Sequence, residues 1–555
     1  MEPIQVRHLG RVPYREAYDL QRSLHQSGSD YLLVLEHPVT ITLGRRADAA
    51  HVLIDPASIG AAVEHTDRGG DVTLHAPGQV VAYPILTIAS DPGAAKDHVR
   101  NLEAAGIAAI QELAGDVDLG GVGRLDGHPG VWIGVEGKRP AKVAAVGVRT
   151  EIVDGVRRTL HGISLNVDVD LTLFEAIVPC GIEEHPVTSL RAAGLEAGVD
   201  HVADALQRHL LAELAPNRPV EIASTRMVVT LADRVLSLEP MNLRRLRAAG
   251  VVPENALPLA TRKPPWLRVP VDLGKGFSAT RSVVGDLDLV TVCEEAGCPN
   301  IFECWADGTA TFMVNGERCT RACGFCLIDT RKPAPLDPTE PERVAEAVDR
   351  MGLAHAVVTC VARDDLADGG AGAIAATIRA IRDRRPDTAV EVLISDCKGD
   401  VDSLELIFDA RPDVLNHNIE TVARLQRAVR PSAGYARSLT VLARAAAAGL
   451  VTKSGLMLGL GERDDEVITT LTDLANVGVS LVTIGQYLRP TADHLPVARY
   501  AEPEVFEELR AAGEALGLAH VQSSPLTRSS YHARDAAGTV PSVPVELSGA
   551  STQAR

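Results

Sequence analysis

The stretch CTRACGFC, residues 319–326, carries three cysteines at the spacing Cys-x3-Cys-x2-Cys. Three thiolates on one short loop, those of Cys319, Cys323 and Cys326, can bind three irons of a cubane iron–sulfur cluster. The fourth iron then has no cysteine from this loop and stays open to a chelating ligand. A structural zinc site is the alternative, but zinc prefers four ligands in paired Cys-x2-Cys units. The spacing therefore favours a cluster with one open iron.

Strand-like and helical segments alternate regularly after this loop. The strand-like segments are AHAVVTC (354–360), AVEVLIS (389–395), DVLNHNI (413–419), VTKSGLMLGL (451–460), SLVTIGQYL (480–488) and AHVQSS (519–524). Helical patterns fill the intervals, for example at 402–410, 421–428 and 464–477. This βαβα order predicts an α/β domain with a parallel sheet or barrel of six strands, a partial (β/α)6 barrel. The glycines and polar residues just past the strands mark the face where barrel enzymes keep their sites.

A second set of cysteines precedes loop 319–326, in VCEEAGCPNIFECW (292–305). Cys293, Cys298 and Cys304 have the spacing Cys-x4-Cys-x5-Cys, which by itself fits either zinc or an iron–sulfur cluster. Their position just ahead of the other triplet suggests an auxiliary cluster, which needs a fourth ligand. Cys360 and Cys397 are candidates by chemistry, and the alternative for both is a small buried core residue.

Length, charge and cysteine count bound the rest of the interpretation. The chain has 555 residues, which implies at least two domains. Its formal net charge of −18 argues against nonspecific nucleic-acid binding and against docking on an anionic membrane. The opening residues predict no secretion signal, and no apolar run reaches the roughly 20 residues of a membrane span. We therefore expect a cytoplasmic protein whose nine cysteines bind metal or do chemistry and form no disulfide framework.

The first half predicts an α/β domain in which sequence-adjacent strands pair antiparallel. YLLVLEHP (31–38) and most of residues 71–88 are strand-like. Residues 94–114 are rich in alanine and have a helical pattern, as has the segment that begins at His201. Asp154-Gly155 is a dipeptide typical of a tight turn and predicts a hairpin between its two flanking strands.

Proline-rich segments divide the chain into its domains. APNRPVEIAS (215–224) and PLATRKPPWLRVP (258–270) are broken by prolines, and MNLRRLRAAGV (241–251) between them predicts one short helix. We predict an N-terminal domain at 1–217, a linker at 218–240, a C-terminal domain at 241–540 and a disordered tail at 541–555.

A lone cysteine in the first half, Cys180, lies between a proline and a glycine, which suggests a turn that presents its thiol. The alternative is a small buried core cysteine. Lys142 is on a strand that we expect to pair, across the Asp154-Gly155 turn, with the strand bearing His161. A nearby ammonium favours the nucleophilic thiolate of a cysteine. The glycines and the imidazole of DRGGDVTLHAPGQ (67–79) add a loop able to wrap a ligand.

Residues from about 240 to 535 closely resemble lipoyl synthase, a radical S-adenosylmethionine (radical SAM) family. The resemblance covers both cysteine triplets and the segments RDDLADGGA (363–371), NHNIETVARL (416–425), KSGLMLGLGE (453–462), TIGQYLRPTADHLPVARY (483–500) and TRSSYHA (527–533). It implies two 4Fe–4S clusters and S-adenosylmethionine as cofactors. Cys319, Cys323 and Cys326 would hold the radical SAM cluster. Cys293, Cys298 and Cys304 would hold the auxiliary cluster, with Ser530 as its fourth ligand and Ser529 as the fallback.

The reaction implied by this resemblance is the insertion of sulfur at carbons six and eight of an octanoyl chain. Neither carbon carries an acidic proton, so a radical must remove its hydrogen, and the family gives up the auxiliary cluster as the sulfur source. The sequence departs from the family at few positions. Cys397 stands where an apolar or small non-cysteine residue is usual, and Cys360 and Ala362 stand where serine and aspartate are common. We expect the two cysteines to be incidental.

Residues 5–215 resemble the lipoate-protein octanoyltransferase family, whose fold is shared with biotin and lipoate ligases. The shared motifs are the RGG-x-VT-x-H-x-PGQ loop (68–79), the K-x-A-x-x-G strand (142–147), the HG-x-x-x-N strand (161–166) and PCGI (179–182). The resemblance implies an acyl-thioester on Cys180 that Lys142 tunes. Its acyl-binding segments map to Arg68, Gly69, Gly70, Asp71, Val72, Thr73, Leu74 and His75, to Ala145, Val146 and Gly147, and to Gly162, Ile163 and Ser164. Ser164 and Ala76 stand where alanine and glycine are common.

The two resemblances describe consecutive steps on one chain, which predicts a bifunctional enzyme of de novo lipoylation. The expected partners are octanoyl-acyl carrier protein, lipoyl carrier domains of 2-oxoacid dehydrogenase complexes and of the glycine cleavage system, an electron donor such as ferredoxin or flavodoxin, and an iron–sulfur carrier. Three alternatives are a lipoyl synthase with a noncatalytic docking domain, a zinc-bound scaffold, and an ATP-dependent lipoate ligase fused to the synthase.

Overall fold

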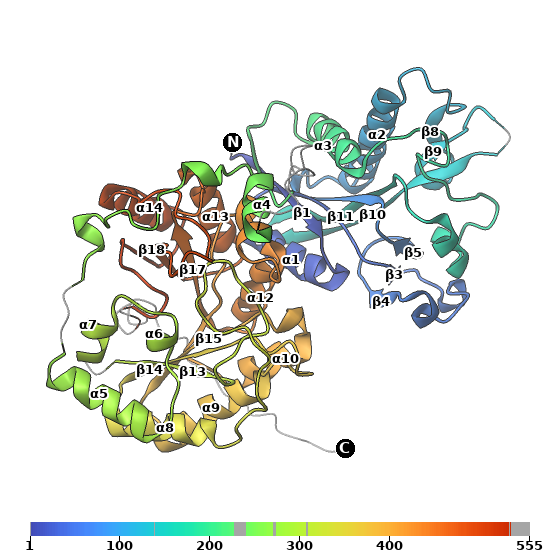
Figure 1. Ribbon diagram of the computed structural model, residues 1–555. Coiled ribbons are helices and arrows are strands. Elements are labelled where there is room, and N and C mark those ends of the chain that lie inside the picture. The colour runs from blue at the N-terminus through green and yellow to red at the C-terminus, as the bar shows by residue number, and fades with distance from the viewer. Residues whose placement is uncertain are drawn as a thin grey trace, which may run out of the picture. The chain divides into compact units, whose positions relative to one another are not determined.

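The computed structural model describes residues 2–137, 139–226, 240–269, 273–306, 309–531 and 533. The chain divides into two compact units, one of Met1–Pro253 with Val422–Ala443 and one of Glu254–Thr421 with Arg444–Arg555. Each unit contains a large sheet flanked by helices (Figure 1). None of the helices in these described ranges is both long enough and apolar enough to cross a bilayer.

The first unit is built on a mixed sheet of nine strands in the order β12-β1-β2-β6-β11-β10-β9-β8, with β7 paired to β11. The strands are β1 (Ile4–Arg11), β2 (Tyr31–Glu36), β6 (Gln79–Ile85), β7 (Thr87–Ile88), β8 (Val122–Leu125), β9 (His128–Ile133), β10 (Ala141–Val153), β11 (Val156–Asn166) and β12 (Val220–Ser224). A smaller sheet has the order β4 (Ala62–His65), β3 (Thr40–Leu43) and β5 (Val72–His75).

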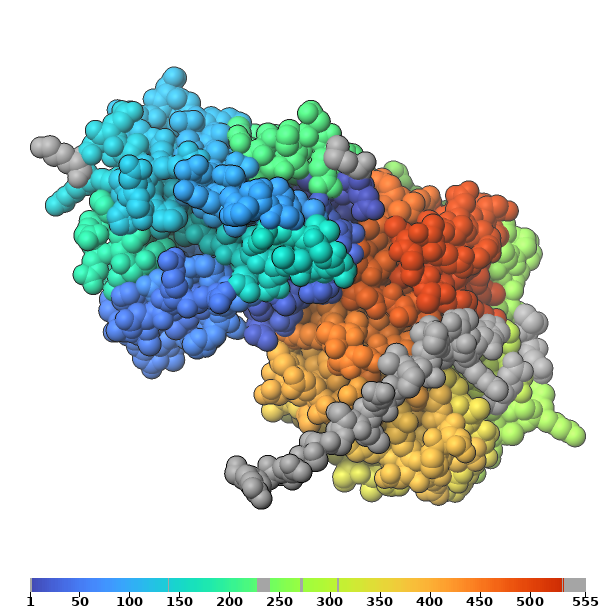
Figure 2. Space-filling view, turned by 180° about the vertical axis from the view of Figure 1, so that it is seen from behind, coloured from blue at the N-terminus to red at the C-terminus, as the bar shows by residue number. Residues whose placement is uncertain are grey.

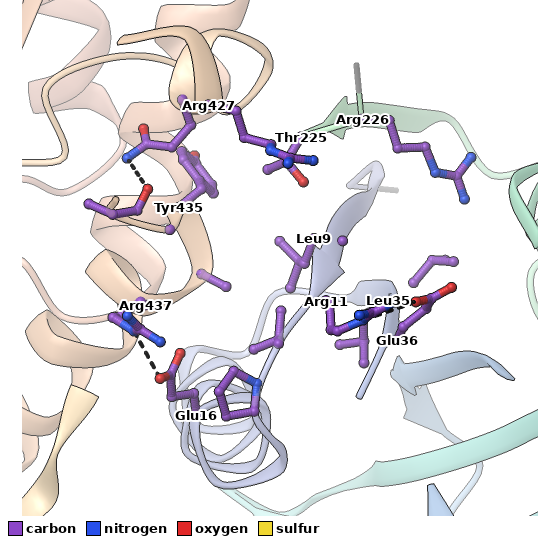
Figure 3. A pocket seen from close by; sticks show the side chains of 18 of the residues that line it. Leu9, Arg11, Glu16, Leu35, Glu36, Thr225, Arg226, Arg427, Tyr435 and Arg437 are labelled. Atoms are coloured by element: carbon purple, nitrogen blue, oxygen red, sulfur yellow. Dashed lines mark hydrogen bonds and ion pairs between the residues drawn. The ribbon is translucent and has the colours of Figure 1, made fainter. Parts of the chain in front are cut away.

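The first two strands run parallel, so the prediction that sequence-adjacent strands pair antiparallel is wrong for β1 and β2. The helix α1 (Tyr14–Ser27) joins them and returns the chain to the starting end of the sheet, as a parallel connection requires. At the far end of the pair, Arg11 and Glu36 face each other in register and form an ion pair of 3.0 Å (Figure 3). The prediction is confirmed for β8, β9, β10 and β11, which pair antiparallel in sequence order.

Two helices, α2 (Ala94–Ala114) and α3 (Val199–Leu214), lie side by side on one face of the mixed sheet, and α1 lies on the other (Figure 1). The alanine-rich α2 approaches the strands closely. A side chain on Gly106 would bring its Cβ to 3.0 Å from both Ile163 and Val131. The small residues that gave this segment its helical pattern therefore also set its distance from the sheet.

The hairpin between β10 and β11 turns at Asp154-Gly155, as predicted. Both residues have positive φ angles, 49° and 79°, which a type I′ turn requires. The antiparallel register pairs Val148 with His161, so the strand of Lys142 lies beside the strand of His161.

The sheet of the first unit extends beyond residue 217. Strand β12, within the segment 218–240 predicted as a linker, pairs parallel with β1. Residues 227–239 of that segment and the tail predicted at 541–555 lie outside the described residues. The short helix predicted at 241–251 is α4 (Met241–Ala248).

The second unit contains a partial barrel of seven parallel strands in chain order. They are β13 (Thr311–Val314), β14 (His355–Cys360), β15 (Ala389–Leu393), β16 (Val414–Asn416), β17 (Val451–Leu458), β18 (Leu481–Gln486) and β19 (His520–Ser523). The last six are the predicted strands. Strand β13 was missed because it lies inside the cysteine-rich region, residues 293–326, between the two cysteine triplets. On the face drawn in Figure 2, the segments after that region are coloured yellow, orange and red.

Helices follow the strands of the barrel in the predicted alternation. They are α8 (Glu340–Met351), α9 (Ala371–Arg384), α10 (Val401–Asp409), α11 (Gln426–Val429), α12 (Tyr435–Ala447), α13 (Asp464–Asn476) and α14 (Pro503–Ala515). The segment predicted as helical at 421–428 is instead a 3-10 turn at Ala423–Leu425 that leads into the single-turn helix α11. Ahead of the barrel lie α5 (Lys275–Asp286), α6 (Val292–Glu295) and α7 (Ile301–Ala306).

Candidate active sites

The thiol of Cys180 lies on a tight turn beside an ammonium group. Cys180 is in a 3-10 turn, Pro179–Gly181, with a positive φ of 57°. Lys142, near the start of β10, donates from Nζ to Cys180 Sγ at 3.4 Å, and it is buried above the ring of Trp132. The backbone of Lys142 also bonds Pro186 and Thr188, so β10 holds the chain that follows the cysteine. The structure thus brings together the two residues that the sequence singled out.

The glycine loop lies against β10. The guanidinium of Arg68 is buried and donates to the hydroxyl of Thr42 at 2.9 Å and to its carbonyl at 2.7 Å. Gly69 N donates to Val148 O at 3.0 Å. A side chain on Gly147 would place its Cβ 3.1 Å from Gly69 O, so the two backbones touch where glycine alone leaves room.

The strand segments at 145–147 and 162–164 pair directly with each other. Ala145 lies opposite Ser164, and Gly147 lies opposite Gly162. At Gly162 a Cβ would stand 2.1 Å from Ala82 O, so β6 can approach β11 there only across a glycine. The three segments predicted to bind the acyl chain, 68–75, 145–147 and 162–164, therefore meet around β10.

Two histidines of this site, His75 and His161, are buried, and burial lowers the pKa of each. Burial lowers the pKa of His75 well below its ordinary value, and the nearby His37 and Arg68 lower it further. His75 stacks on Tyr14 with ring centroids 5.7 Å apart. His161 Nε2 bonds Asp67 Oδ1 at 2.8 Å, yet burial still lowers the pKa of this imidazole. Ser164 uses its hydroxyl on Gln79 at 3.3 Å.

The cysteine loop 319–326 follows β13 and is tied to the loop after β14. Cys319 N donates to Asp329 O at 2.8 Å, and Thr320 N donates to Ala362 O at 2.9 Å. Cys319 and Cys326 pack against a small apolar cluster of Met313, Ile328 and Val361. The three thiols of this loop therefore stand at the carboxyl ends of the first barrel strands, where barrel enzymes keep their sites.

A buried arginine inside the loop fastens it to two further strands. Arg321 donates to both oxygens of Asp364 at 2.8 Å and to Asp396 Oδ1 at 2.6 Å. Although burial opposes it, these bonds hold the pKa of Arg321 above its ordinary value. Asp364 follows β14 and Asp396 follows β15, so one guanidinium joins three consecutive loops. The sequence interpretation missed this group, and the only available signal was an arginine between two cysteines.

Comparison with known proteins identifies both regions. Residues 13–211 match the model of the lipoyl protein ligase A/B catalytic domain, and residues 313–474 match that of the radical SAM superfamily. A lipoyl synthase of Rubrobacter xylanophilus is 55% identical over 275 residues, which cover 49% of this chain and 86% of that protein. The chain belongs to the lipoyl synthase family. Another lipoyl synthase, from Mycobacterium leprae, is 51% identical over 308 residues, which cover 55% of this chain and 97% of that protein.

A solved structure resembles the first region. It is a bi-partite lipoate protein ligase with its E2 lipoyl domain, from an archaeal lipoylation system of Thermoplasma acidophilum. It is 16% identical, with a TM-score of 0.32, and the match covers 40% of this chain and 88% of that one. The match to lipoyl synthases and to the radical SAM superfamily model makes the chain an enzyme of lipoate biosynthesis, with 4Fe–4S clusters and S-adenosylmethionine as cofactors, and residues 13–211 add a region that matches the lipoyl protein ligase A/B catalytic domain.

The cysteines of the lipoyl synthase region fit iron–sulfur ligation. Burial raises the pKa of Cys326 to about 12, and burial also raises the pKa of Cys293 and of Cys298. Such thiols stay protonated at neutral pH unless a metal binds them, because a coordinating metal removes the proton outright. Within the described part of the chain, no three His, Cys, Asp or Glu side chains gather as for a single metal ion. The thiolates of a cubane cluster each bind a different iron, so that finding concerns single ions only.

The segment Leu526–Tyr531 lies against the region of the triplet Cys293, Cys298 and Cys304, called the first triplet because it comes first in the chain. Asn300, between Cys298 and Cys304, donates from Nδ2 to Leu526 O at 2.8 Å. The Tyr531 hydroxyl donates to Glu303 at 3.1 Å, next to Cys304. The guanidinium of half-buried Arg528 is close enough to Cys298 to lower the pKa of that thiol, against the larger effect of burial.

Cys360 and Cys397, which belong to neither triplet, lie near the loop of Cys319, Cys323 and Cys326. Cys360 ends β14, and burial raises the pKa of its thiol to about 12, with further contributions from Cys397 and Cys319. Cys397, after β15, is 3% exposed, and burial raises its pKa to about 11. Cys397 is therefore buried as a small core residue would be, whereas Cys360 is half-buried at the end of its strand.

Proposed function

We propose that residues 1–217 transfer an octanoyl group from acyl carrier protein to a lysine of a lipoyl carrier domain, through a thioester on Cys180. Residues 241–540 then insert two sulfur atoms, at carbons six and eight, to give lipoyl-lysine on the same carrier. The observation that carries the first step is the contact of 3.4 Å from Lys142 Nζ to Cys180 Sγ. The second step rests on the lipoyl synthase relatives.

The acyl transfer follows from this pair. The ammonium of Lys142 stabilises the thiolate of Cys180, which attacks the carbonyl of the acyl donor. The donor's carbon–sulfur bond breaks, and its sulfur takes a proton from Lys142 and leaves as a thiol. The acyl chain would run along the segments 68–75, 145–147 and 162–164, which the glycines allow to approach closely. In the second half-reaction, the neutral amine of the carrier lysine attacks the thioester, its proton returns to Lys142, and Cys180 leaves as a thiolate beside that ammonium. Each half-reaction exchanges one acyl acceptor for another, so neither consumes ATP.

The sulfur-insertion step uses the two cysteine triplets as separate ligand sets. Cys319, Cys323 and Cys326 would hold the radical SAM cluster, and Cys293, Cys298 and Cys304 would hold the auxiliary one. When bound, these clusters and S-adenosylmethionine supply the radical that removes hydrogen from unactivated carbon and the sulfur that replaces it. The chain positions both ligand sets. Arg321 fastens the loop of Cys319, Cys323 and Cys326, and Leu526–Tyr531 lies against the region of Cys293, Cys298 and Cys304.

Ser530 is the serine that we assign as fourth ligand of the auxiliary cluster. Its neighbour Ser529 is engaged elsewhere, because Asn418 donates from Nδ2 to Ser529 Oγ at 2.6 Å. Ser530 is the next residue, so it lies between Ser529, which Asn418 holds, and Tyr531, which bonds Glu303. A hydroxyl binds iron less firmly than a thiolate, so this corner of the cluster suits a site that releases sulfur.

The partners are those that the resemblance to the two families implies. The acyl donor would be octanoyl-acyl carrier protein, and the acceptors would be lipoyl carrier domains of 2-oxoacid dehydrogenase complexes and of the glycine cleavage system. An electron donor such as ferredoxin or flavodoxin would reduce the radical SAM cluster, and an iron–sulfur carrier would rebuild the auxiliary one. All of these act in the cytoplasm, where we place the protein.

The test supplies one purified chain with octanoyl-acyl carrier protein, S-adenosylmethionine, a reductant and an apo carrier domain, and follows the intact mass of the carrier. The wild-type chain should give lipoyl carrier without ATP. Cys180→Ser should give none, yet should still convert a carrier that already bears octanoate. Cys323→Ser should stop at octanoyl carrier. Octanoylation by Cys180→Ser would overturn the thioester on Cys180. A wild-type chain that never octanoylates the carrier would favour a noncatalytic docking role for residues 1–217.

The two serines form a matched pair for the ligand assignment. Ser530→Ala should lower the iron bound by the first triplet and stop sulfur insertion, while octanoyl transfer continues. Ser529→Ala loses only a bond from Asn418 and should keep its iron. The opposite outcome would assign the ligand to Ser529.

A further inference from the structure

A fully buried indole beside the first triplet has a hydrogen-bond donor without a partner. Trp305 follows Cys304 directly, in the helix α7, and none of its surface is exposed. Among the described residues, no group accepts a hydrogen bond of ordinary geometry from its Nε1–H. Buried donors are almost always paired, because an unpaired one has lost its bond to water and gained none in the protein. The indole therefore has room for an acceptor at the triplet.

The surroundings of Trp305 hold its ring in one place. The helix α7 packs against α5, and a Cβ on Gly276 of α5 would stand 2.1 Å from Ala306 O. The hydroxyl of Thr280, also in α5, donates to Trp305 O at 2.9 Å. The indole packs against the ring of Phe277, with 5.2 Å between the ring centroids. Packing against α5 therefore fixes the direction in which the indole N–H points.

The sulfur of Cys293 is the group that this donor approaches. Cys293 is 7% exposed, and burial raises the pKa of its thiol, whereas hydrogen bonding to Thr311 and to the side chain of Trp305 lowers it. A neutral thiol is a weak acceptor. A thiolate bound to iron is ionised, and hydrogen bonds to ionised acceptors are shorter and roughly twice as strong. Ligation of iron by Cys293 would therefore give the indole its partner.

We propose that Trp305 is a positioning residue of the auxiliary cluster, and that its indole N–H donates to the iron-bound thiolate of Cys293. Such a bond draws electron density from the sulfur and stabilises the reduced cluster, because hydrogen bonds to the sulfurs help to set the reduction potential. It also secures the corner of Cys293, whereas Ser530 holds its corner with a weaker hydroxyl ligand. This inference rests on the proposed ligand set of the auxiliary cluster and adds a residue to it.

The test measures the reduction potential of the auxiliary cluster in the full-length chain. A parent chain with Cys319→Ala and Cys323→Ala lacks the radical SAM cluster, so the potential belongs to the auxiliary one. In this parent, Trp305→Phe keeps an aromatic ring but has no donor. Its one-electron reduction should be about tenfold less favourable, a shift of about 59 mV to more negative potential, with about four irons still bound per chain.

A second variant keeps the shape of the indole. β-(3-Benzothienyl)alanine at position 305 has a ring sulfur in place of the N–H group, so it should give the same shift even where phenylalanine disturbs the packing. Phe277→Leu is the matched control, because it loosens the packing of Trp305 but leaves the donor in place. Trp132→Phe removes an indole of the first unit, which donates to His128 O at 3.0 Å. Both controls should keep the potential of the parent chain.

The outcomes are distinguishable. A parent chain that binds no iron would overturn the ligand set itself, and this proposal with it. A parent chain that binds about four irons, beside a benzothienylalanine chain whose reduction equilibrium lies within about twofold of the parent, would overturn only the role of Trp305. An equal shift in Phe277→Leu would also overturn that role, because it would assign the effect to packing and not to the N–H group.

Discussion

Replacement of Lys453 by methionine should destabilise the barrel more than any surface change, because it leaves a charge alone in the core. Lys453 Nζ lies 2.9 Å and 3.2 Å from the two oxygens of Glu391, and both side chains are 1% exposed. Asn416 donates to the same carboxylate at 3.1 Å. Removing one partner of such a buried pair costs about 3–5 kcal/mol, since the remaining charge keeps its desolvation penalty.

The effect of pH follows from the sign of the shift. In the wild-type chain burial opposes ionisation, yet Lys453 holds the pKa of Glu391 below its ordinary value. The pair therefore stabilises the fold above the ordinary pKa of glutamate, and this stability is lost as the pH falls through the lowered value. In Lys453→Met, burial is opposed only by the weaker contribution of His355, 3.5 Å from the carboxylate, and the pKa of Glu391 should rise. The destabilisation should then be smaller at pH 5 than at pH 8.

The assay is hydrogen exchange of peptides from β15 and β17, which reports opening of the barrel alone. A loss of about 3–5 kcal/mol lowers protection by roughly 10²- to 10⁴-fold, since each tenfold is worth about 1.36 kcal/mol. The double variant Glu391→Leu with Lys453→Met should recover most of the protection, because no charge stays buried. Protection within tenfold of wild type in Lys453→Met, or a double variant as weak as the single one, would refute this account.

Three further predictions concern the two sites. Lys142→Met removes the ammonium 3.4 Å from Cys180 and should slow loading of octanoate by at least about 100-fold, measured by intact mass. Arg321→Lys keeps the charge but loses the planar fork that joins three loops. The iron content per chain and the cluster absorbance should fall toward the values expected for one cluster. An unchanged iron content would contradict this. In Gly162→Ala, the added Cβ would stand 2.1 Å from Ala82 O. The free energy of unfolding of the first unit, measured in urea, should fall by about 1–3 kcal/mol, and that of the barrel should not change.

Local patterns were enough to predict much of the fold. The six strands β14–β19 follow from apolar runs separated by helical ones, and α2 follows from its alanine-rich pattern. The turn at Asp154-Gly155 follows from the positive φ angles that these two residues tolerate. Strand β13 was missed because its apolar run is short and lies between two cysteine sets. The parallel pairing of β1 with β2 was missed because the direction of a strand depends on the connection between strands.

The candidate sites likewise combine features that local sequence patterns predict with features that only the fold determines. The spacing of Cys319, Cys323 and Cys326 is a local property, and it pointed to an open cluster before any fold was known. The motifs around Lys142 and Cys180 named both residues, but their contact of 3.4 Å depends on β10 and on a turn 38 residues away. No local pattern marks Trp305 as a donor to Cys293, because the direction of the indole depends on the packing of α7 against α5.

By itself the sequence determined which chemistry the chain can carry: two cysteine triplets, a presented thiol and a strand lysine. These are properties of residue type and spacing along the chain. Only the tertiary structure decided which groups meet. It placed Arg321 between the loops of three strands, engaged Ser529 with Asn418, and packed the indole of Trp305 against Phe277. These contacts join side chains from segments far apart in the chain, and their packing is determined by the whole fold.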